Sequence, residues 1–230
     1  KILNVNGTAV INYRLNNYNI LKKKLKLRNI KIITFGSKDI YFNNKTSLIL
    51  NVFGEKYKIQ KLNLNNIQME NLECAIACAI AMNINIDRII KSLPALKSAP
   101  GRYEEINYSK KSSKIIIDYA HTPDAIEHVL KAYSDKKIKP SIIFGCGGDR
   151  DKDKRKKMAI IVKKYANKIY ITDDNPRNEN PENIRKTLIK YCPKGLEISD
   201  RRIASKTAIS EIDTNEILII AGKGHEKYQI

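Results

Sequence analysis

The chain has 230 residues, and its 43 Lys and Arg outnumber 24 Asp and Glu to give a formal net charge of +19 at pH 7. The length allows one large core or two modest ones, and the charge alone would suggest nucleic-acid binding. However, the basic residues are mostly Lys, spread evenly among many Ile and Asn as in an A/T-rich genome, so we expect no nucleic-acid partner. No apolar run approaches the ~18 residues that span a bilayer and no signal peptide is recognisable, so we expect a cytoplasmic protein without membrane insertion.

The first hundred residues are predicted to form short strands and helices separated by turns. Strands are predicted over residues 8–12, 30–35, 47–53 and 56–62. Gly54 suits a hairpin turn between the last two strands, and a helix is predicted over residues 16–27. Apolar spacing predicts a buried helix over residues 69–82, and Asp87 is expected to cap a short helix that ends at Leu93.

Residues 97–100 resemble a linker, and strands then alternate with helices. Strands are predicted over residues 114–117, 141–144 and 168–172, near 196, and over 216–221. Four helices are predicted. The first begins at residue 123, the second ends at about residue 165, the third begins at residue 181, and the fourth spans residues 203–212. Thr122 and Asn180 are the expected N-caps, each followed by Pro at the first helical position. This alternation predicts an α/β domain over residues 100–230 with a Rossmann-like, doubly wound and mostly parallel sheet, separate from residues 1–99.

The four cysteines show neither a CxxC pair nor a His partner at metal-ligand spacing. Cys74 and Cys78 lie four residues apart on an apolar helical stripe, so we expect them to pack in a core. Together with Cys146 and Cys192 they fit reduced thiols of a cytosolic protein.

Polar clusters follow four of the predicted strands, at the carboxyl ends where open α/β sheets bind ligands. They occupy residues 118–121, 145–150, 173–177 and 222–226. In TDDNPR at residues 172–177, Arg177 can form two parallel hydrogen bonds with a carboxylate, and an Asp can hold an ammonium group. This stretch suits a small ligand that carries both groups, although an ordinary polar loop would look similar.

The other clusters allow two interpretations each. GCGGDRD at residues 145–151 has the layout of a phosphate or carboxylate cradle, but its glycines could simply permit a tight turn. Asp118 could hold a ribose or belong to a capping network. His121 and His225 could contact a ligand or be ordinary hydrogen-bonded side chains.

These segments together carry a family resemblance. They are GRYE at 101–104, DYAHTPD at 118–124, GCGGDRD at 145–151, KR at 154–155, TDDNPR at 172–177 and AGKGHEKYQ at 221–229. In order and spacing they resemble the Mur ligases, with weaker similarity over residues 9–12 and 68–71. The DNPR form resembles the branch that adds meso-diaminopimelate to UDP-N-acetylmuramoyl-L-Ala-D-Glu, because lysine-adding members usually lack this arginine.

The resemblance implies an ATP-dependent, Mg²⁺-requiring ligase of peptidoglycan precursor synthesis, expected to be a monomer. ATP would phosphorylate the D-glutamate carboxylate, and the amine of the incoming amino acid would attack the acyl phosphate. By resemblance, ATP would be held by Asn71 at adenine, Asp118 at ribose, Arg102 at the terminal phosphates, and His121 nearby. Diaminopimelate would be held by Arg150, Asp174, Asn175, Arg177, Gly222 and Glu226.

By the same resemblance, residues 1–99 would be the C-terminal part of the ATP-binding central domain. Residues 100–230 would form most of the amino-acid-binding domain, without its last helices. The Walker A loop, the metal-binding residues and a carbamylated lysine are expected upstream, so no catalytic or metal residue is assigned here and the chain alone should be inactive. Tyr13 and Arg14 replace an acidic pair of the family, and Asn65, Ile67 and Gln68 depart from its central motif.

Two alternatives remain open at this point. The chain could belong to a Mur-type ligase that adds another amino acid such as L-lysine. It could also be a non-catalytic remnant of such a gene.

Overall fold

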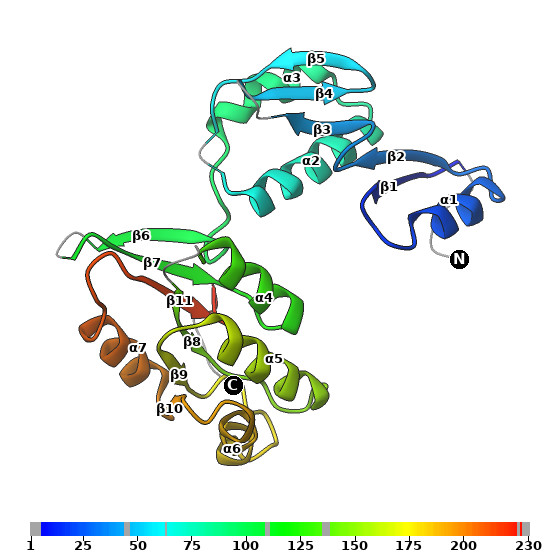
Figure 1. Ribbon diagram of the computed structural model, residues 1–230. Helices are drawn as coiled ribbons and strands as arrows, with labels where there is room; N and C mark the ends of the chain where they lie inside the picture. The colour runs from blue at the N-terminus through cyan, green and yellow to red at the C-terminus, as the bar shows by residue number, and fades with distance from the viewer. Residues whose placement is uncertain are drawn as a thin grey trace. The chain divides into compact units, whose positions relative to one another are not determined.

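A computed structural model describes residues 6–43, 47–62, 64–108, 111–134, 139–224 and 226. The chain divides into two compact units, the N-terminal unit (residues 1–97) and the C-terminal unit (residues 98–230). Figure 1 labels the helices and strands of both units. None of the described helices is long and apolar enough to cross a membrane.

The N-terminal unit contains a five-stranded sheet in the order β1-β2-β3-β4-β5. Its strands are β1 (Thr8–Asn12), β2 (Lys31–Phe35), β3 (Ile40–Asn43), β4 (Ile49–Val52) and β5 (Glu55–Lys58). Pairing is parallel from β1 to β3 and antiparallel from β3 to β5. The predicted hairpin is confirmed: its turn residues, Phe53 and Gly54, have φ angles of 48° and 95°, as a type I′ turn requires.

The N-terminal unit also contains the helices α1 (Tyr18–Lys26), α2 (Asn66–Ala81) and α3 (Ile86–Ser92). A 3₁₀ turn, η1 (Leu93–Ala95), follows α3. The cap predicted for α3 was wrong. Asn85 accepts hydrogen bonds from the amides of Asp87 (2.8 Å) and Arg88 (3.4 Å), and Asp87 lies inside the first turn. Asn85 is the N-cap because its backbone is extended, which lets its side chain reach the free amides of the first turn.

The expected core packing of Cys74 and Cys78 was also wrong in part, since Cys74 is half-buried and Cys78 is exposed in its unit. The buried positions of α2 are Met69, Glu73, Ile76 and Ala77. They recur at helical spacing on the face toward the sheet. Positions 74 and 78 follow the buried ones by one residue, which turns them about 100° away from the core.

The C-terminal unit contains a six-stranded sheet in the order β10-β9-β8-β11-β7-β6. Its strands are β6 (Glu104–Tyr108), β7 (Ser113–Asp118), β8 (Ser141–Phe144), β9 (Ile169–Ile171), β10 (Leu196–Glu197) and β11 (Ile217–Ala221). All neighbouring pairs are parallel except β6 with β7. The predicted α/β, doubly wound class is therefore confirmed.

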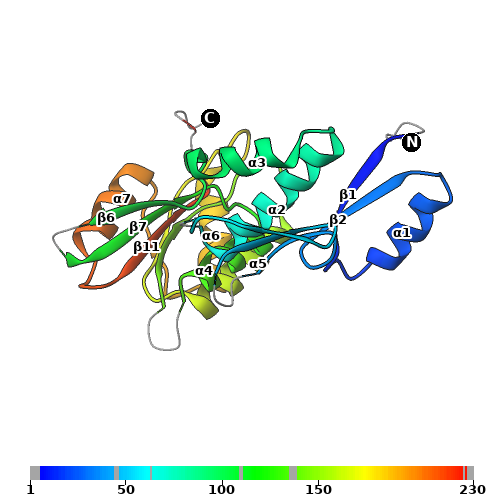
Figure 2. The same cartoon turned by 90° about the horizontal axis from the view of Figure 1, so that it is seen from above.

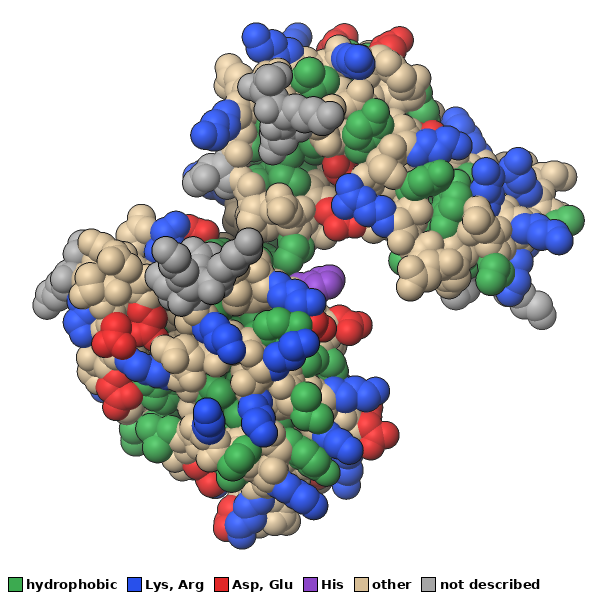
Figure 3. All heavy atoms as spheres, viewed as in Figure 1, with side chains coloured by type: hydrophobic (Ala, Val, Ile, Leu, Met, Phe, Trp, Pro, Cys, Tyr) green, Lys and Arg blue, Asp and Glu red, His purple; other side chains and the backbone are tan. Residues whose placement is uncertain are grey.

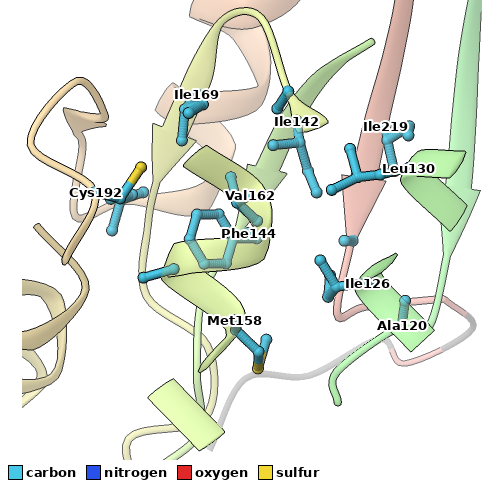
Figure 4. Close-up of a cluster of buried hydrophobic side chains, with 14 of the residues drawn as sticks. Ala120, Ile126, Leu130, Ile142, Phe144, Met158, Val162, Ile169, Cys192 and Ile219 are labelled. Carbon is cyan, nitrogen blue, oxygen red and sulfur yellow. The ribbon is translucent and has the colours of Figure 1, made fainter. Parts of the chain in front are cut away.

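Four helices cover both faces of this sheet: α4 (Pro123–Ala132), α5 (Asp153–Tyr165), α6 (Pro181–Tyr191) and α7 (Arg201–Ser210). Successive strand residues point to opposite faces, so Ile142 packs with α4, α5 and α6 while Ile143 packs with α7. Figure 2 shows α7 on one side of the sheet and α4 and α5 on the other. In Figure 4, Phe144 of β8 lies against Met158 and Val162 of α5 in the larger core.

Candidate functional site

A pocket of 280 Å³ lies at the carboxyl ends of β7, β8, β9 and β11. It is lined by Tyr119, His121, Thr122, Gly147, Arg150, Asp151, Lys154, Asp174, Asn175, Arg177, Gly222 and Glu226. All six residues predicted for diaminopimelate are among them, together with His121. Parallel strands place their following loops at one edge, which is why segments far apart in the sequence meet here.

Glycines in the loop after β8 allow it to pack directly against the loop after β9. A Cβ atom on Gly148 would lie 1.9 Å from the Pro176 carbonyl oxygen, and one on Gly147 would lie 2.7 Å from Arg177 Nη1. The Gly148 amide donates to the Asn175 carbonyl at 2.9 Å. The Asp149 amide donates to the Glu179 carboxylate at 2.7 Å. These two amides are therefore used within the protein, which favours loop packing over an anion cradle for them.

Arg177 is held so that part of its guanidinium stays available. Its Nη1 donates to the carbonyl oxygens of Gly148 (2.8 Å) and Asn175 (3.3 Å). Its Nε and Nη2 have no hydrogen-bond partner within the described part of the chain. Because these two N–H groups point along one edge of the guanidinium, they can meet both oxygens of a carboxylate. Arg150, also exposed on the pocket wall, adds a second cation.

A partly buried ion pair fixes the two loops behind the pocket. Buried Arg155 donates from Nη1 and Nη2 to the two oxygens of Glu179, at 3.0 and 2.8 Å, and from Nη2 to the Gly147 carbonyl at 3.2 Å. The hydrogen bonds from Arg155 and the Asp149 amide lower the pKa of Glu179 to about 2. Asp149 in turn accepts from the Asn178 backbone and side chain. Arg155 therefore holds the loops after β8 and β9 in place.

The acidic side of the pocket consists of Asp174 and Glu226. Asp174 is only 7% exposed, and its Oδ1 accepts from the Asn175 amide at 2.7 Å. Glu226 accepts from the Tyr119 hydroxyl at 3.2 Å. The other carboxylate of the motif, Asp173, forms an ion pair with Arg185 and does not line this pocket.

Sequence reasoning missed Arg201 at the start of α7. Its Nε donates to the Asp173 carbonyl at 3.0 Å and its Nη1 to the Ala221 carbonyl at 2.9 Å, while Nη2 lies 3.9 Å from Asp174 Oδ2. Burial lowers the pKa of this guanidinium, and the nearby carboxylates oppose the shift. One signal was present: a basic residue in a first helical turn opposes the helix dipole and so needs another partner.

Of the residues predicted to bind the nucleotide, His121 lines the pocket, whereas Asn71, Arg102 and Asp118 do not. Asp118 is buried, and its two oxygens accept from the amides of Tyr103 (2.9 Å) and Ala120 (2.8 Å), as in the capping alternative. Burial raises its pKa, while these amides and Arg102 lower it. His121 is exposed and its Nδ1 lies 2.9 Å from the Tyr119 carbonyl, so Nδ1 carries a proton. Asn71 lies exposed on α2 in the N-terminal unit.

A larger hollow of 710 Å³ adjoins the pocket and shares Glu226 with it. Its other lining residues are Asp173, Ser199, Asp200, Arg201, Arg202, Ser205 and Lys223. Asp173 and Arg201 are already occupied by the contacts given above. The smaller pocket contains all six residues predicted for diaminopimelate, whereas the larger hollow contains only Glu226 of them.

The pocket brings two arginines and two carboxylates together at the carboxyl edge of a doubly wound sheet, the edge at which open α/β sheets bind ligands. Comparison with known families defines the class of protein. The Mur ligase, glutamate ligase domain family matches residues 101–224. The chain belongs to the Mur ligase family, which confirms the resemblance seen in its motifs.

Curated relatives agree with this family. A UDP-N-acetylmuramoyl-L-alanyl-D-glutamate–2,6-diaminopimelate ligase from Rickettsia montanensis is 38% identical over 237 residues, which cover 98% of this chain and 49% of the relative. A relative of the same name from Anaplasma marginale is 38% identical over 247 residues, covering 100% and 49%. The chain thus spans about half the length of the curated relatives it matches.

Solved structures share the fold. The structure of a UDP-N-acetylmuramoyl-L-alanyl-D-glutamate–2,6-diaminopimelate ligase aligns with a TM-score of 0.53 at 30% identity, covering 97% of this chain and 49% of that one. A bifunctional folylpolyglutamate synthase/dihydrofolate synthase from Yersinia pestis aligns with a TM-score of 0.73 at 14% identity, covering 95% and 51%. The second likeness concerns the fold alone.

Proposed function

We propose that this chain is the amino-acid-binding part of an ATP-dependent ligase that adds meso-diaminopimelate to UDP-N-acetylmuramoyl-L-Ala-D-Glu. The activity named for its relatives supports this assignment. The observation that carries it is the charge pattern of the 280 Å³ pocket, in which arginines and carboxylates lie around one small space.

Diaminopimelate has two carboxylates and two ammonium groups, and the pocket offers a partner for each kind. Arg177 and Arg150 suit the carboxylates, with Asp174 and Asn175 beside them. Glu226 and the Gly222 backbone suit the distal amino-acid end. Lysine lacks the second carboxylate and would leave an arginine without its partner. Because both arginines are exposed to water, we expect a discrimination on the order of tenfold to a hundredfold rather than more.

The chain's part in the reaction is to hold the amine that attacks. The new C–N bond forms at the acyl phosphate of the D-glutamate, the C–O bond to phosphate breaks, and the amine loses a proton. Fixing the amine next to this carbon replaces a bimolecular encounter by a positioned one. Arg102, at the same rim, is proposed for the terminal phosphates of ATP, because a cation near phosphoryl oxygens stabilises their charge. Asp118 is proposed for the ribose, with His121 nearby.

The Mg²⁺ that accompanies ATP is not assigned to residues of this chain. Within the described ranges, no group of three or more His, Cys, Asp or Glu side chains is placed to hold a metal ion. The complete reaction, as proposed, also needs the half of the relatives' length that this chain does not span.

Calorimetric titration of the 230-residue chain with meso-diaminopimelate and with L-lysine tests the proposal. We expect lysine to bind at least about tenfold more weakly. Arg177→Ala should reduce diaminopimelate affinity to the level of lysine and leave ATP use in a complete ligase almost unchanged, since Arg177 lies in the amino-acid pocket.

Arg202→Ala is the matched control, because Arg202 is an exposed arginine of the neighbouring hollow. Its diaminopimelate affinity should equal that of the wild type. Equal affinity of the wild type for both amino acids would contradict the assignment of Arg177. Preference for lysine would move the chain to another branch of the family.

A further inference from the structure

Three loops interlock beside the pocket: the segment around Arg102, the segment after β7, and the segment after β11. The Tyr103 amide donates to Asp118 at 2.9 Å, which joins the first two. A Cβ atom on Gly224 would lie 2.5 Å from the Gly101 carbonyl oxygen, so only glycine lets the third loop approach the first this closely. Direct contacts therefore hold these three segments against one another.

Tyr119 lies at the centre of this junction. The Arg102 guanidinium carbon is 4.1 Å from the centroid of its ring, within cation–π distance. The His121 ring lies edge-on at 4.7 Å and 71°. The Tyr119 hydroxyl donates to Glu226 Oε1 at 3.2 Å. Burial and the neighbouring Glu226 raise the pKa of Tyr119, so the hydroxyl keeps its proton at neutral pH.

These contacts form a route from Arg102 to the pocket. Arg102 itself is not among the lining residues, whereas Tyr119 and Glu226 are. Glu226 can hold an ammonium group in one orientation only if its carboxylate is fixed, and the Tyr119 hydroxyl supplies a fixing hydrogen bond. Arg102 lies over the face of the same ring. The family resemblance had given Arg102 to the phosphates of ATP alone.

We infer that Tyr119 is a positioning residue for Glu226, and that Arg102 sets amino-acid affinity through the face of Tyr119. This inference rests on the proposed function. Arg102, proposed for phosphate, is thereby linked to Glu226, proposed for an ammonium group. An amino acid that lacks the ammonium group held by Glu226 should be insensitive to the link.

Calorimetric titration of the 230-residue chain tests the inference with two ligands. These are meso-diaminopimelate and 2-aminopimelate, which keeps both carboxylates but has only one amino group. Tyr119→Phe retains the ring and removes the hydrogen bond to Glu226. It should weaken diaminopimelate binding about tenfold. It should leave 2-aminopimelate binding unchanged, which a merely structural defect would not do.

Arg102→Gln should weaken diaminopimelate binding about two- to fivefold, although Arg102 lies outside the pocket lining. In the Tyr119→Leu background the same change should have no further effect, because the ring that carries it is gone. Arg102→Lys, which keeps the charge but loses the planar stack, should fall between the wild type and Arg102→Gln.

The outcomes separate the inference from the proposed function. If the wild type binds diaminopimelate but Arg102→Gln changes nothing, or changes it equally with and without Tyr119, the inference is wrong and the function stands. Equal losses for both ligands in Tyr119→Phe would also overturn it. If the wild type binds neither ligand, the proposed function fails first.

Discussion

Three arginines near the pocket differ in what holds them, and this decides what each can do. Arg155 is buried and its two Nη groups are bound to Glu179. Arg201 is bound to two backbone carbonyls and ties the end of β9 to the end of β11. Arg177 uses only Nη1 for its anchors. A residue type that suits carboxylate recognition therefore becomes a ligand-binding group only where the protein leaves part of it available.

Glu179→Gln should remove a contribution to stability that depends on pH. The folded pKa of Glu179 is about 2, below its ordinary value of 4.5, because Arg155 and the Asp149 amide stabilise the carboxylate. Such a group stabilises the fold above pH 4.5, and the contribution is lost as the pH falls toward 2. Urea unfolding of both proteins should show the largest difference at pH 7 and a clearly smaller one at pH 3.

Glu182→Gln provides the comparison for this prediction. The pKa of Glu182 is also lowered, chiefly by a hydrogen bond from Lys186, but both side chains are exposed. Exposed pairs of this kind contribute little. Its unfolding curve should stay close to that of the wild type at every pH. A Glu179→Gln difference that is the same at pH 7 and pH 3 would show that the ion pair does not act through the carboxylate charge.

At the scale of elements, α2 is held at its start by a reciprocal cap. The Asn65 side chain accepts from the amides of Ile67 (3.0 Å) and Gln68 (2.9 Å), and Gln68 accepts from the Asn65 amide at 3.0 Å. Asn65→Ala should therefore lower the free energy of unfolding of the N-terminal unit by about 1 kcal/mol. Asn66→Ala, at the exposed next position, should cost much less. Equal effects in thermal or urea unfolding would argue against the cap.

Elements defined by local signals could be predicted from the sequence. Residues 8–12 and 141–144 form strands with the predicted ends, because alternating or continuous β-branched residues stop at turns. Two strands were missed. The edge strand β6 (Glu104–Tyr108) is mostly exposed and carries charges, so it shows no hydrophobic pattern. The four-residue β3 (Ile40–Asn43) depends on its antiparallel partner β4 for its strand structure.

The residues of the candidate site could be found from the sequence, but their supports could not. Polar residues after predicted strands mark the rim, so Asp174 and Arg177 stand out. The partners that hold the rim lie far away along the chain: Arg155 pairs with Glu179, and Arg201 binds the Asp173 carbonyl. No local pattern specifies such pairs. Only the register of the parallel sheet brings them together.

At the scale of the whole molecule, net charge says little about function. On the face shown in Figure 3, Lys and Arg side chains are dispersed over both units, with Asp and Glu side chains among them. Many cations are already engaged within the fold, as Lys168 is with Asp213 and Glu216. A charge of +19 that is spread in this way raises solubility without defining a binding surface on that face.

Residues 98–230 alone should bind meso-diaminopimelate within about twofold of the 230-residue chain, because independent sites contribute additively. This unit has its own core on both faces of its sheet, and all six proposed substrate residues belong to it. Residues 94–100, on both sides of the boundary after Lys97, are exposed, so separation there removes little buried surface from that segment. Calorimetry on the shorter chain, with Arg177→Ala in the same chain as the non-binding control, measures the effect. A shorter chain that unfolds cooperatively yet binds more than about tenfold weaker would place part of the amino-acid site in residues 1–97.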